Sequence, residues 1–446
     1  MALAQPIAES PRRFSPFRSV LIISDSQIRI AELEPMLQRK GYNTVASTFS
    51  GSQLQGIPRH APDVILISFA QSQSKLASIV SVLRKRYENK NVPIIGVFAD
   101  EHADHTQLVD SALFEPAHGE QIAHRVSAMI RLNIMQTEIA FRMDTLREDF
   151  GIEYRLNPNA FDDRLRVLFI GKATPEFMVI INALEQKNVE VVAAFTSFTA
   201  FDFLHETIFD AVMMNALNGM EPGLTIAQTM RKNSALYHTP GLLLTRREMF
   251  ESTIAYEHGI SDIIYSDADE KDIQDRILEL ARFHRLHRQV KAEFENLGQA
   301  ECLDESGTYS AVFFSNHLNR LVQHYSVQDL PVSLLTVQVK FVGQEPHDNS
   351  VRCNVLSQVG SMVKNLVRVY DVTARLSDNI YVIGFPGQPS SSLEPVVDRL
   401  NSMAGTLQFG PDSSGRKTYQ VEFKLDLTEL GHGVTGESWL AQQLGR

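Results

Sequence analysis

The chain has 446 residues, roughly three times the length of an ordinary domain. Its hydrophobic fraction of 43% supplies apolar side chains for several cores, which excludes intrinsic disorder for most of the chain. The formal charge of −11 argues against DNA binding, which needs clustered lysines and arginines to meet the phosphates. A local basic site for a small anionic ligand remains compatible with this charge.

Cysteine usage and the N-terminus indicate a cytoplasmic protein. The two cysteines, Cys302 and Cys353, come without any CxxC or Cys/His spacing, so neither a disulfide framework nor a zinc site is expected. No apolar run approaches the ~18 residues of a spanning helix, and no membrane insertion is expected. Residues 1–17 carry three prolines and no apolar signal-peptide core, which predicts a disordered tail.

Two successive segments repeat one pattern of apolar strands and helices. The first predicts strands at 19–25, 42–46, 63–67 and 92–98, and helices at 28–40, 75–86 and 119–150. The second predicts strands at 165–170, 189–194, 210–214, 240–245 and 262–265, and a long helix at 269–296. Continuous apolar strands between helices indicate a parallel sheet covered on both faces. We therefore predict two flavodoxin-like α/β domains, at 18–150 and 164–292.

The last segment, residues 298–446, has a different rhythm. It predicts strands at 331–341, 373–376, 379–385 and 418–427, and helices at 351–366, 393–403 and 438–444. The second and third strands are separated by two residues, which is typical of a hairpin. The expected structure is an α+β domain with a partly antiparallel sheet, so the whole chain is an α/β and α+β multidomain protein.

Two motifs in this last segment are informative together with the order of the domains. The predicted hairpin reads Ser377-Asp-Asn-Ile-Tyr381, and Arg368-Val-Tyr-Asp371 ends five residues before it. The arrangement resembles response regulators of the PopA/PleD-like group, which join two receiver domains to a GGDEF domain. The resemblance covers residues 18–446 and implies two receiver folds followed by a nucleotide-cyclase-like α+β fold.

Both receiver-like segments depart from the phosphorylation chemistry of that family. A receiver is phosphorylated on an aspartate that follows its third strand, and this reaction needs a divalent cation and a lysine nearby. The aspartate position holds Ser68 in the first segment and Asn215 in the second, while the lysine positions hold Glu115 and Ser266. We expect both domains to be degenerate receivers that take no phosphate.

The GGDEF-like segment also departs from a cyclase at its catalytic positions. The hairpin lacks both glycines, its acidic position is Asn379, and the first-strand metal aspartate falls at Gln338. Without a carboxylate pair a catalytic Mg²⁺ has no ligands. We expect a degenerate GGDEF domain with no catalytic residues, no metal and no cofactor. The alternative is an active diguanylate cyclase that uses unusual metal ligands such as Asp371 or Asp378.

The resemblance implies a second nucleotide site, for cyclic di-GMP, at the RxxD motif. Its residues here are Arg368 and Asp371, and the family's further arginine on the helix after the hairpin falls at Arg399. A guanidinium pairs with guanine or phosphate in bidentate fashion, and a carboxylate accepts from the guanine N–H groups. The alternative is a surface helix end at which Arg368 and Asp371 form an i,i+3 ion pair.

The resemblance also implies partners, which no single residue of this sequence indicates. It implies an adaptor that brings cell-cycle regulators to regulated proteolysis, positioned at the cell pole, with a homodimer through the receiver domains. A docking protein that binds no nucleotide is the third alternative. His284 and His287, three residues apart on the basic second long helix, are interpreted as a solvated face, and Trp439 as packing for the last helix.

Overall fold

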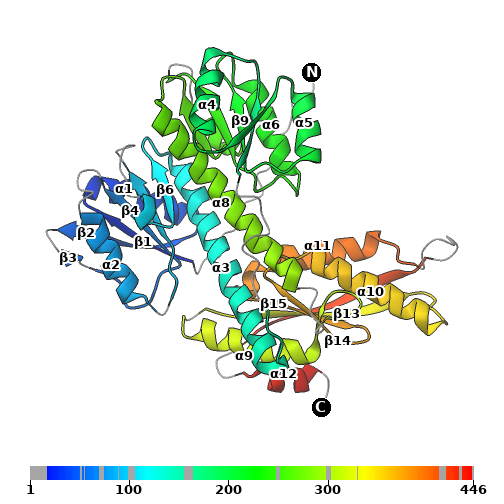
Figure 1. Cartoon of the computed structure of the whole chain (residues 1–446). Helices are drawn as coiled ribbons and strands as arrows, with labels where there is room; N and C mark the ends of the chain where they lie inside the picture. The colour runs from blue at the N-terminus through cyan, green and yellow to red at the C-terminus, as the bar shows by residue number, and fades with distance from the viewer. Residues whose placement is uncertain are drawn as a thin grey trace, which may run out of the picture. The chain divides into compact units, whose positions relative to one another are not determined.

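The computed structural model describes residues 18–50, 53–54, 56–69, 75–88, 90–98, 106–154, 164–247, 252–297, 303–328, 330–410, 418–430 and 434–443. The predicted tail at 1–17 and Cys302 lie outside these residues. Within them, the chain folds into three sheets (Figure 1). No described helix combines the length and apolar character that crossing a bilayer requires.

The chain folds as two compact units. The parallel-sheet unit comprises Ser19–Asn133 and Asn157–Val290, and it holds the first two sheets. The C-terminal unit comprises Ile134–Leu156 and Lys291–Arg446, with Arg18, and it holds the third sheet. The three predicted domain ranges stay a prediction, because these two units divide the chain differently.

The first sheet has the strand order β3-β2-β1-β4-β5-β6. Its strands are β1 (Ser19–Ser24), β2 (Asn43–Ser50), β3 (Gln53–Leu54), β4 (Val64–Phe69), β5 (Ile94–Phe98) and β6 (Ser111–Phe114). Only the short β2–β3 hairpin is antiparallel. Its helices are α1 (Gln27–Arg39), α2 (Leu76–Arg86) and the start of α3 (Gly119–Phe150). Without β3 the order is 2-1-3-4-5, the flavodoxin-like order that the sequence predicted.

The second sheet repeats this topology with the order β11-β10-β9-β7-β8, and every pair in it is parallel. Its strands are β7 (Arg166–Ile170), β8 (Glu190–Ala194), β9 (Ala211–Asn215), β10 (Gly241–Thr245) and β11 (Asp262–Tyr265). Its helices are α4 (Pro175–Glu185), α5 (Ser197–Glu206), α6 (Glu221–Lys232), α7 (Ser252–Glu257) and α8 (Glu270–Leu297). Two separate apolar cores cover its two faces, as continuous apolar strands require.

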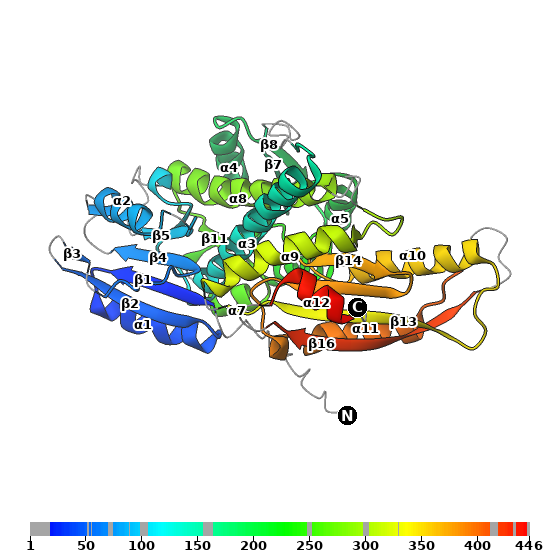
Figure 2. The same cartoon turned by 90° about the horizontal axis from the view of Figure 1, so that it is seen from below.

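The third sheet has the order β12-β14-β15-β13-β16 and is mostly antiparallel. Its strands are β12 (Tyr309–Ser310), β13 (Ser333–Val342), β14 (Val372–Ser377), β15 (Ile380–Phe385) and β16 (Gln420–Glu429). Helices α10 (Asn349–Asn365) and α11 (Glu394–Thr406) complete a βαββαβ unit of ferredoxin-like type (Figure 2). The predicted strands and helices of this segment are confirmed.

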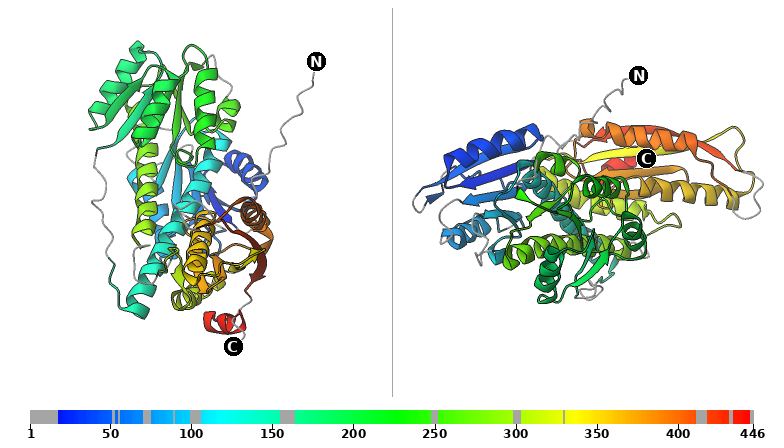
Figure 3. Two further views of the ribbon diagram at one scale, coloured as in Figure 1. Left: turned by 90° about the vertical axis from the view of Figure 1, so that its right-hand side faces the viewer. Right: turned by 90° about the horizontal axis from the view of Figure 1, so that it is seen from above.

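The two faces of the third sheet carry different helices. Side chains of α10 and α11 share one apolar core with Leu335, Val337 and Val339 of β13. A Cβ on Gly384 would meet the side chains of Leu334 and of Phe314, the latter from α9 (Ala311–Ser326) on the opposite face. The last helix, α12 (Gly436–Gln443), is drawn in red in Figure 3 and contacts α9. Trp439 is 3% exposed, and its ring lies 6.0 Å from that of Phe314 at an interplanar angle of 56°, so its predicted packing role is confirmed.

Candidate functional site

The RxxD motif forms a tight turn between α10 and β14. The Asp371 N–H donates to the Arg368 carbonyl at 2.9 Å, and the Arg368 N–H donates back to Asp371 Oδ2 at 2.9 Å. Gln388 bridges the two side chains, because its Oε1 accepts from Arg368 Nη1 at 2.9 Å and its Nε2 reaches Asp371 Oδ1 at 3.5 Å. The structure therefore brings Arg368 and Asp371 together through backbone and amide contacts. No direct ion pair joins their side chains among the described residues.

The two motif residues differ in their access to solvent. Asp371 is 6% exposed, and burial raises its pKa to about 6, although the charge of Arg368 and the Arg368 N–H oppose that rise. Arg368 is exposed, and its guanidinium lies 5.7 Å from the centre of the Tyr370 ring. The arginine is thus the group that faces solvent, while the buried carboxylate shapes the turn beneath it.

The third predicted ligand, Arg399, lies on α11 and is exposed. No hydrogen bond or ion pair of the described chain joins it to Arg368 or Asp371. Its role at the site stays a prediction.

Two residues near the motif were missed by sequence reasoning. Gln388 follows β15 and forms the bridge described above. Arg18 is close enough to act electrostatically on Arg368, and it is 7% exposed. Neither residue stands at a motif position, so no spacing signal could have found them.

The GGDEF-like hairpin is closed against its own sheet. Asn379 donates from Nδ2 to the Val339 carbonyl at 3.1 Å and accepts the Val339 N–H on its own carbonyl at 2.8 Å. Arg375 donates to the carbonyls of Ser377 at 3.2 Å and Asp378 at 2.7 Å. Tyr381 is fully buried, with its hydroxyl on the Leu356 carbonyl at 2.6 Å. In the part of the chain that is described, no three His, Cys, Asp or Glu residues gather as a metal site.

In the first sheet, Arg29 of α1 contacts Ser68 and Glu115, the two residues that the resemblance aligns with the aspartate and the lysine of a receiver. Arg29 Nε donates to Ser68 Oγ at 3.2 Å, and its Nη2 is hydrogen-bonded to Glu115 Oε1. The Ser24 hydroxyl donates to the Ser68 carbonyl at 2.7 Å. Arg29 of α1 thus neutralises the Glu115 carboxylate, which stands at the lysine position of the receiver pattern. The polar groups at the ends of β1 and β4 are hydrogen-bonded within the protein.

In the second sheet, Asn215 stands at the aspartate position of the receiver pattern, and its side chain is hydrogen-bonded to the backbone. Asn215 Nδ2 donates to the Lys172 carbonyl at 3.1 Å, and its Oδ1 accepts the Leu217 N–H at 3.0 Å. Gly171 has φ +133°, and a Cβ there would lie 2.6 Å from the Asn215 Cβ. A glycine is therefore required where the family has an acidic residue, because any side chain would clash with Asn215.

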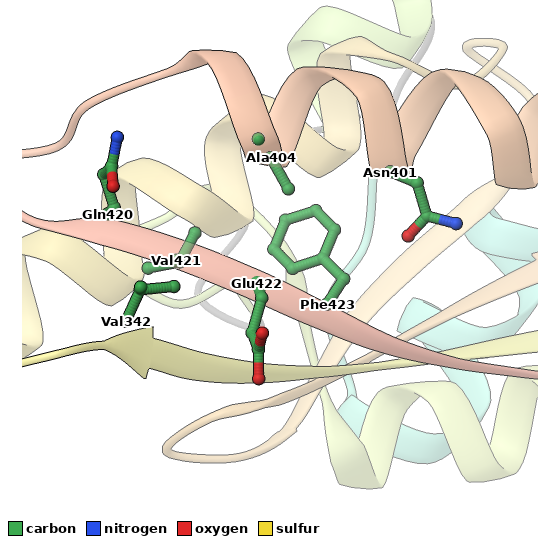
Figure 4. A pocket seen from close by; sticks show the side chains of 8 residues that line it. Val342, Asn401, Ala404, Gln420, Val421, Glu422 and Phe423 are labelled. Carbon is green, nitrogen blue, oxygen red and sulfur yellow. The ribbon is translucent and has the colours of Figure 1, made fainter.

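A cavity of about 210 Å³ lies between α11 and the start of β16. Figure 4 shows the Phe423 ring beneath the helix near Ala404, whereas Glu422 points to the other side of the strand. The lining includes this carboxylate and no lysine or arginine. Such a lining is unsuited to a ligand that carries phosphate charges.

Comparison with known proteins adds the following findings. No protein-family model matches the sequence. No curated protein matches it. A chemotaxis response regulator of Vibrio cholerae aligns with 26% of this chain and 98% of its own, at 16% identity and a TM-score of 0.25.

Two GGDEF domains also align. That of FimX from Pseudomonas aeruginosa covers 33% of this chain and 91% of its own, at 15% identity and a TM-score of 0.28. That of DgcB from Caulobacter crescentus, in complex with c-di-GMP, has the same coverages, at 12% identity and a TM-score of 0.27. At these scores the likenesses carry no argument about function, and the fold rests on the strand orders of this chain.

Proposed function

We propose that the chain is a non-catalytic receptor for cyclic di-GMP in bacterial signalling. The dinucleotide binds at the loop that holds Arg368, and Asp371 sets the shape of that loop. Arg399 completes the site as a second arginine.

The observation that carries the proposal is an exposed arginine, Arg368, whose guanidinium is held in place by buried partners. Arg368 is fixed through Gln388 Oε1 and through the Asp371 turn, while the residue as a whole is exposed and the surrounding protein partly desolvates its guanidinium. A guanidinium held in this way loses little conformational entropy on binding and can pair in bidentate fashion with a phosphate or a guanine edge. The charge of Arg18 adds to the positive potential around it, which favours a ligand with two phosphodiester charges.

The proposal that the chain does not catalyse rests on the closed hairpin. Gln338 replaces the carboxylate that would bind Mg²⁺, and Asn379 is hydrogen-bonded to the backbone of β13. Tyr381 fills the space beneath the hairpin. The electrostatic stabilisation on which phosphoryl transfer depends has no groups here to supply it.

Calorimetric titration with cyclic di-GMP tests the binding. Wild-type protein should bind, and Arg368→Ala should weaken binding by about tenfold or more, because a charge-assisted hydrogen bond contributes ~1.5–3 kcal/mol. Arg399→Ala should weaken binding as well if that arginine is a ligand. Lys424→Ala, which removes an exposed charge from β16, is the matched control and should bind as wild type does.

Two assays distinguish this proposal from the alternative functions. Incubation with GTP and Mg²⁺ should yield no cyclic di-GMP, and measurable product would favour a diguanylate cyclase with unusual ligands. Absence of binding heat in the wild type would favour a docking protein that takes no nucleotide.

The resemblance to PopA/PleD-like regulators extends the proposal to partners. On that basis the liganded chain acts as an adaptor in the cytoplasm, at the cell pole, and recruits cell-cycle regulators for proteolysis. The same resemblance supports a homodimer through the receiver domains. This layer rests on the resemblance alone, and it is tested by capture of such regulators with wild type and with Arg368→Ala in the presence of cyclic di-GMP.

A further inference from the structure

Strand β16 forms one edge of the third sheet (Figure 2). It pairs antiparallel with β13 in continuous register, from Gln420 opposite Val342 to Glu429 opposite Ser333. No described strand pairs with its other side. The strand has no proline, no glycine and no bulge, which are the features that commonly keep a sheet edge from pairing. The edge can therefore accept a further strand.

The hydrogen-bond pattern of the pair shows which backbone groups face outward. The Leu430 N–H donates to the Val332 carbonyl at 2.9 Å, so the even-numbered residues of β16 are bonded to β13. The odd-numbered residues Phe423, Leu425 and Leu427 direct their N–H and C=O groups away from the sheet. All three residues are partly exposed, and no hydrogen bond among the described residues uses these outward groups.

The beginning of the same edge is already occupied. Just before β16, Tyr419 exchanges two backbone hydrogen bonds with Phe409, at 2.6 and 2.9 Å. The next outward residue, Val421, is 2% exposed. A further strand is therefore restricted to the segment that begins at Phe423.

The polar face of this segment carries charges of alternating sign. Glu422, Lys424 and Asp426 are exposed on the face of the sheet opposite α11, and Figure 4 shows Glu422 directed away from that helix. Within the sheet, Lys424 stands opposite Gln338 and Asp426 stands opposite Thr336, which are both uncharged. No ion pair within the described part of the chain uses Lys424 or Asp426. Both charges are therefore available to a partner.

A second copy of β16, antiparallel to the first about a two-fold axis at Leu425, fits the backbone and the charges together. Leu425 then pairs with Leu425 of the partner subunit, and Phe423 pairs with Leu427 of the partner subunit, so the outward backbone groups are bonded. Lys424 lies opposite Asp426 of the partner subunit, in a pair that is not hydrogen-bonded and whose side chains are close. The symmetry forms this ion pair twice.

The neighbouring registers fit less well. An axis at Phe423 would require the outward groups of Tyr419 and Val421, which are bonded or buried. An axis at Leu427 would place Asp426 opposite Thr428 of the partner subunit and would leave both charges unpaired. The axis at Leu425 also places an aliphatic side chain opposite Phe423, which lines the cavity of about 210 Å³ beside α11.

We propose that two copies of the chain associate through antiparallel pairing of their β16 strands about Leu425. The two third sheets become one continuous sheet, and Lys424 of each chain forms an ion pair with Asp426 of the other. This contact uses no residue of the Arg368 turn, so it is independent of the cyclic di-GMP proposal. It also differs from a homodimer through the receiver domains, because β16 lies in the C-terminal unit.

Sedimentation velocity of the full chain over a range of concentrations tests the association. Wild type should form a dimer that weakens as salt is added, because both ion pairs are exposed. Lys424→Glu and Asp426→Lys should each weaken the dimer about tenfold or more, because both cross-strand pairs change from attraction to repulsion. Glu345→Lys reverses an exposed charge between β13 and α10, and this matched control should dimerise as wild type does.

A mixing experiment tests the register. Equal amounts of the Lys424→Glu and Asp426→Lys chains should form a dimer when combined, because one chain is then negative at both positions and the other is positive at both. This rescue also establishes that the two variants fold. The proposal is overturned by wild type that stays monomeric, by a dimer that neither variant weakens, or by variants that remain apart when mixed.

Discussion

At the scale of single residues, Asp371 shows how a motif residue can be held apart from solvent. Its carboxylate lies beneath the turn, accepts from the Arg368 N–H, and reaches Gln388. Folding therefore changes its proton affinity, which gives a measurable signature that does not depend on any ligand. This pH dependence distinguishes a buried structural carboxylate from an exposed carboxylate that is free to bind guanine.

The unfolding free energy should depend on the protonation of Asp371. Its pKa is about 6 in the folded chain against an ordinary 3.8, because burial disfavours the charged form. The folded state thus holds this proton more tightly, so its contribution to stability is fully present below pH 3.8 and is lost as pH rises through 6. Across that window wild type should lose about 3 kcal/mol relative to Asp371→Asn, as measured by urea unfolding at a series of pH values.

The comparison has a direct control. Asp378→Asn removes one exposed carboxylate from the neighbouring hairpin turn and controls for the loss of a charge. Parallel pH profiles of wild type and Asp371→Asn would show that Asp371 is ionised throughout this range, and the buried turn described above would then be incorrect.

At the scale of elements, the C-terminal half of α3 is fixed to α9 through a buried polar cluster. Glu138 Oε1 accepts from Arg142 Nε at 2.7 Å and lies 2.9 Å from His317 Nε2. His317 Nδ1 lies 3.1 Å from Thr145 Oγ1, and the Arg142 guanidinium stacks 4.7 Å over the Phe294 ring. Burial alone would raise the pKa of Glu138, but His317 and Arg142 hold it below its ordinary value.

Removal of one partner from this cluster should be strongly destabilising. Arg142→Met leaves the Glu138 carboxylate buried without its arginine, and breaking a buried pair in this way costs about 3–5 kcal/mol. Denaturant unfolding should show that loss. The double variant Glu138→Met/Arg142→Met removes the uncompensated charge and should recover part of it.

An exposed arginine on the same helix provides the matched comparison. Arg147 pairs with Asp144 and Glu148 at the surface, and Arg147→Met should change the unfolding free energy little. If Arg142→Met behaves like Arg147→Met, the buried cluster does not hold α3 to α9.

The elements also show which parts of the fold the sequence could predict. Apolar runs predicted the strands at 19–25 and 165–170, because burial on both faces leaves no polar position in a strand. Helical spacing predicted the long helix at 119–150. Helix α9 was not predicted, although Ser310 caps it by accepting the Phe313 N–H at 3.2 Å, which is a local signal. The interpretation of His284 and His287 as a solvated face is wrong, because they are 5% and 9% exposed. Their burial depends on contacts far apart in sequence, and local spacing cannot report it.

The candidate site also combines features that the sequence could predict with features that it could not. The spacing of Arg368 and Asp371 before the hairpin was readable from the sequence, and the structure places both residues on one turn. The bridge by Gln388 and the burial of Asp371 depend on how the end of β15 packs beside the turn. Such packing has no sequence period, so the burial of Asp371 could not be predicted.

At the scale of the whole molecule, the proposed cyclic di-GMP site lies in one of the two compact units. Arg368 and its turn belong to the C-terminal unit. The chain also has a single tryptophan, Trp439, which is buried in the C-terminal unit beside Phe314. Its fluorescence therefore reports the unfolding of one unit, while far-ultraviolet circular dichroism reports the helices and strands of both.

Cyclic di-GMP should stabilise the unit that binds it. A ligand at one hundred times its Kd adds about 2.7 kcal/mol to the folded state, which raises the midpoint of a unit of this size by about 5–11 °C. Cyclic di-GMP should raise the Trp439 midpoint, and Arg368→Ala should abolish that rise. A Trp439 midpoint unmoved by saturating cyclic di-GMP would contradict binding at the Arg368 turn, since any ligand that binds only the folded unit must stabilise it.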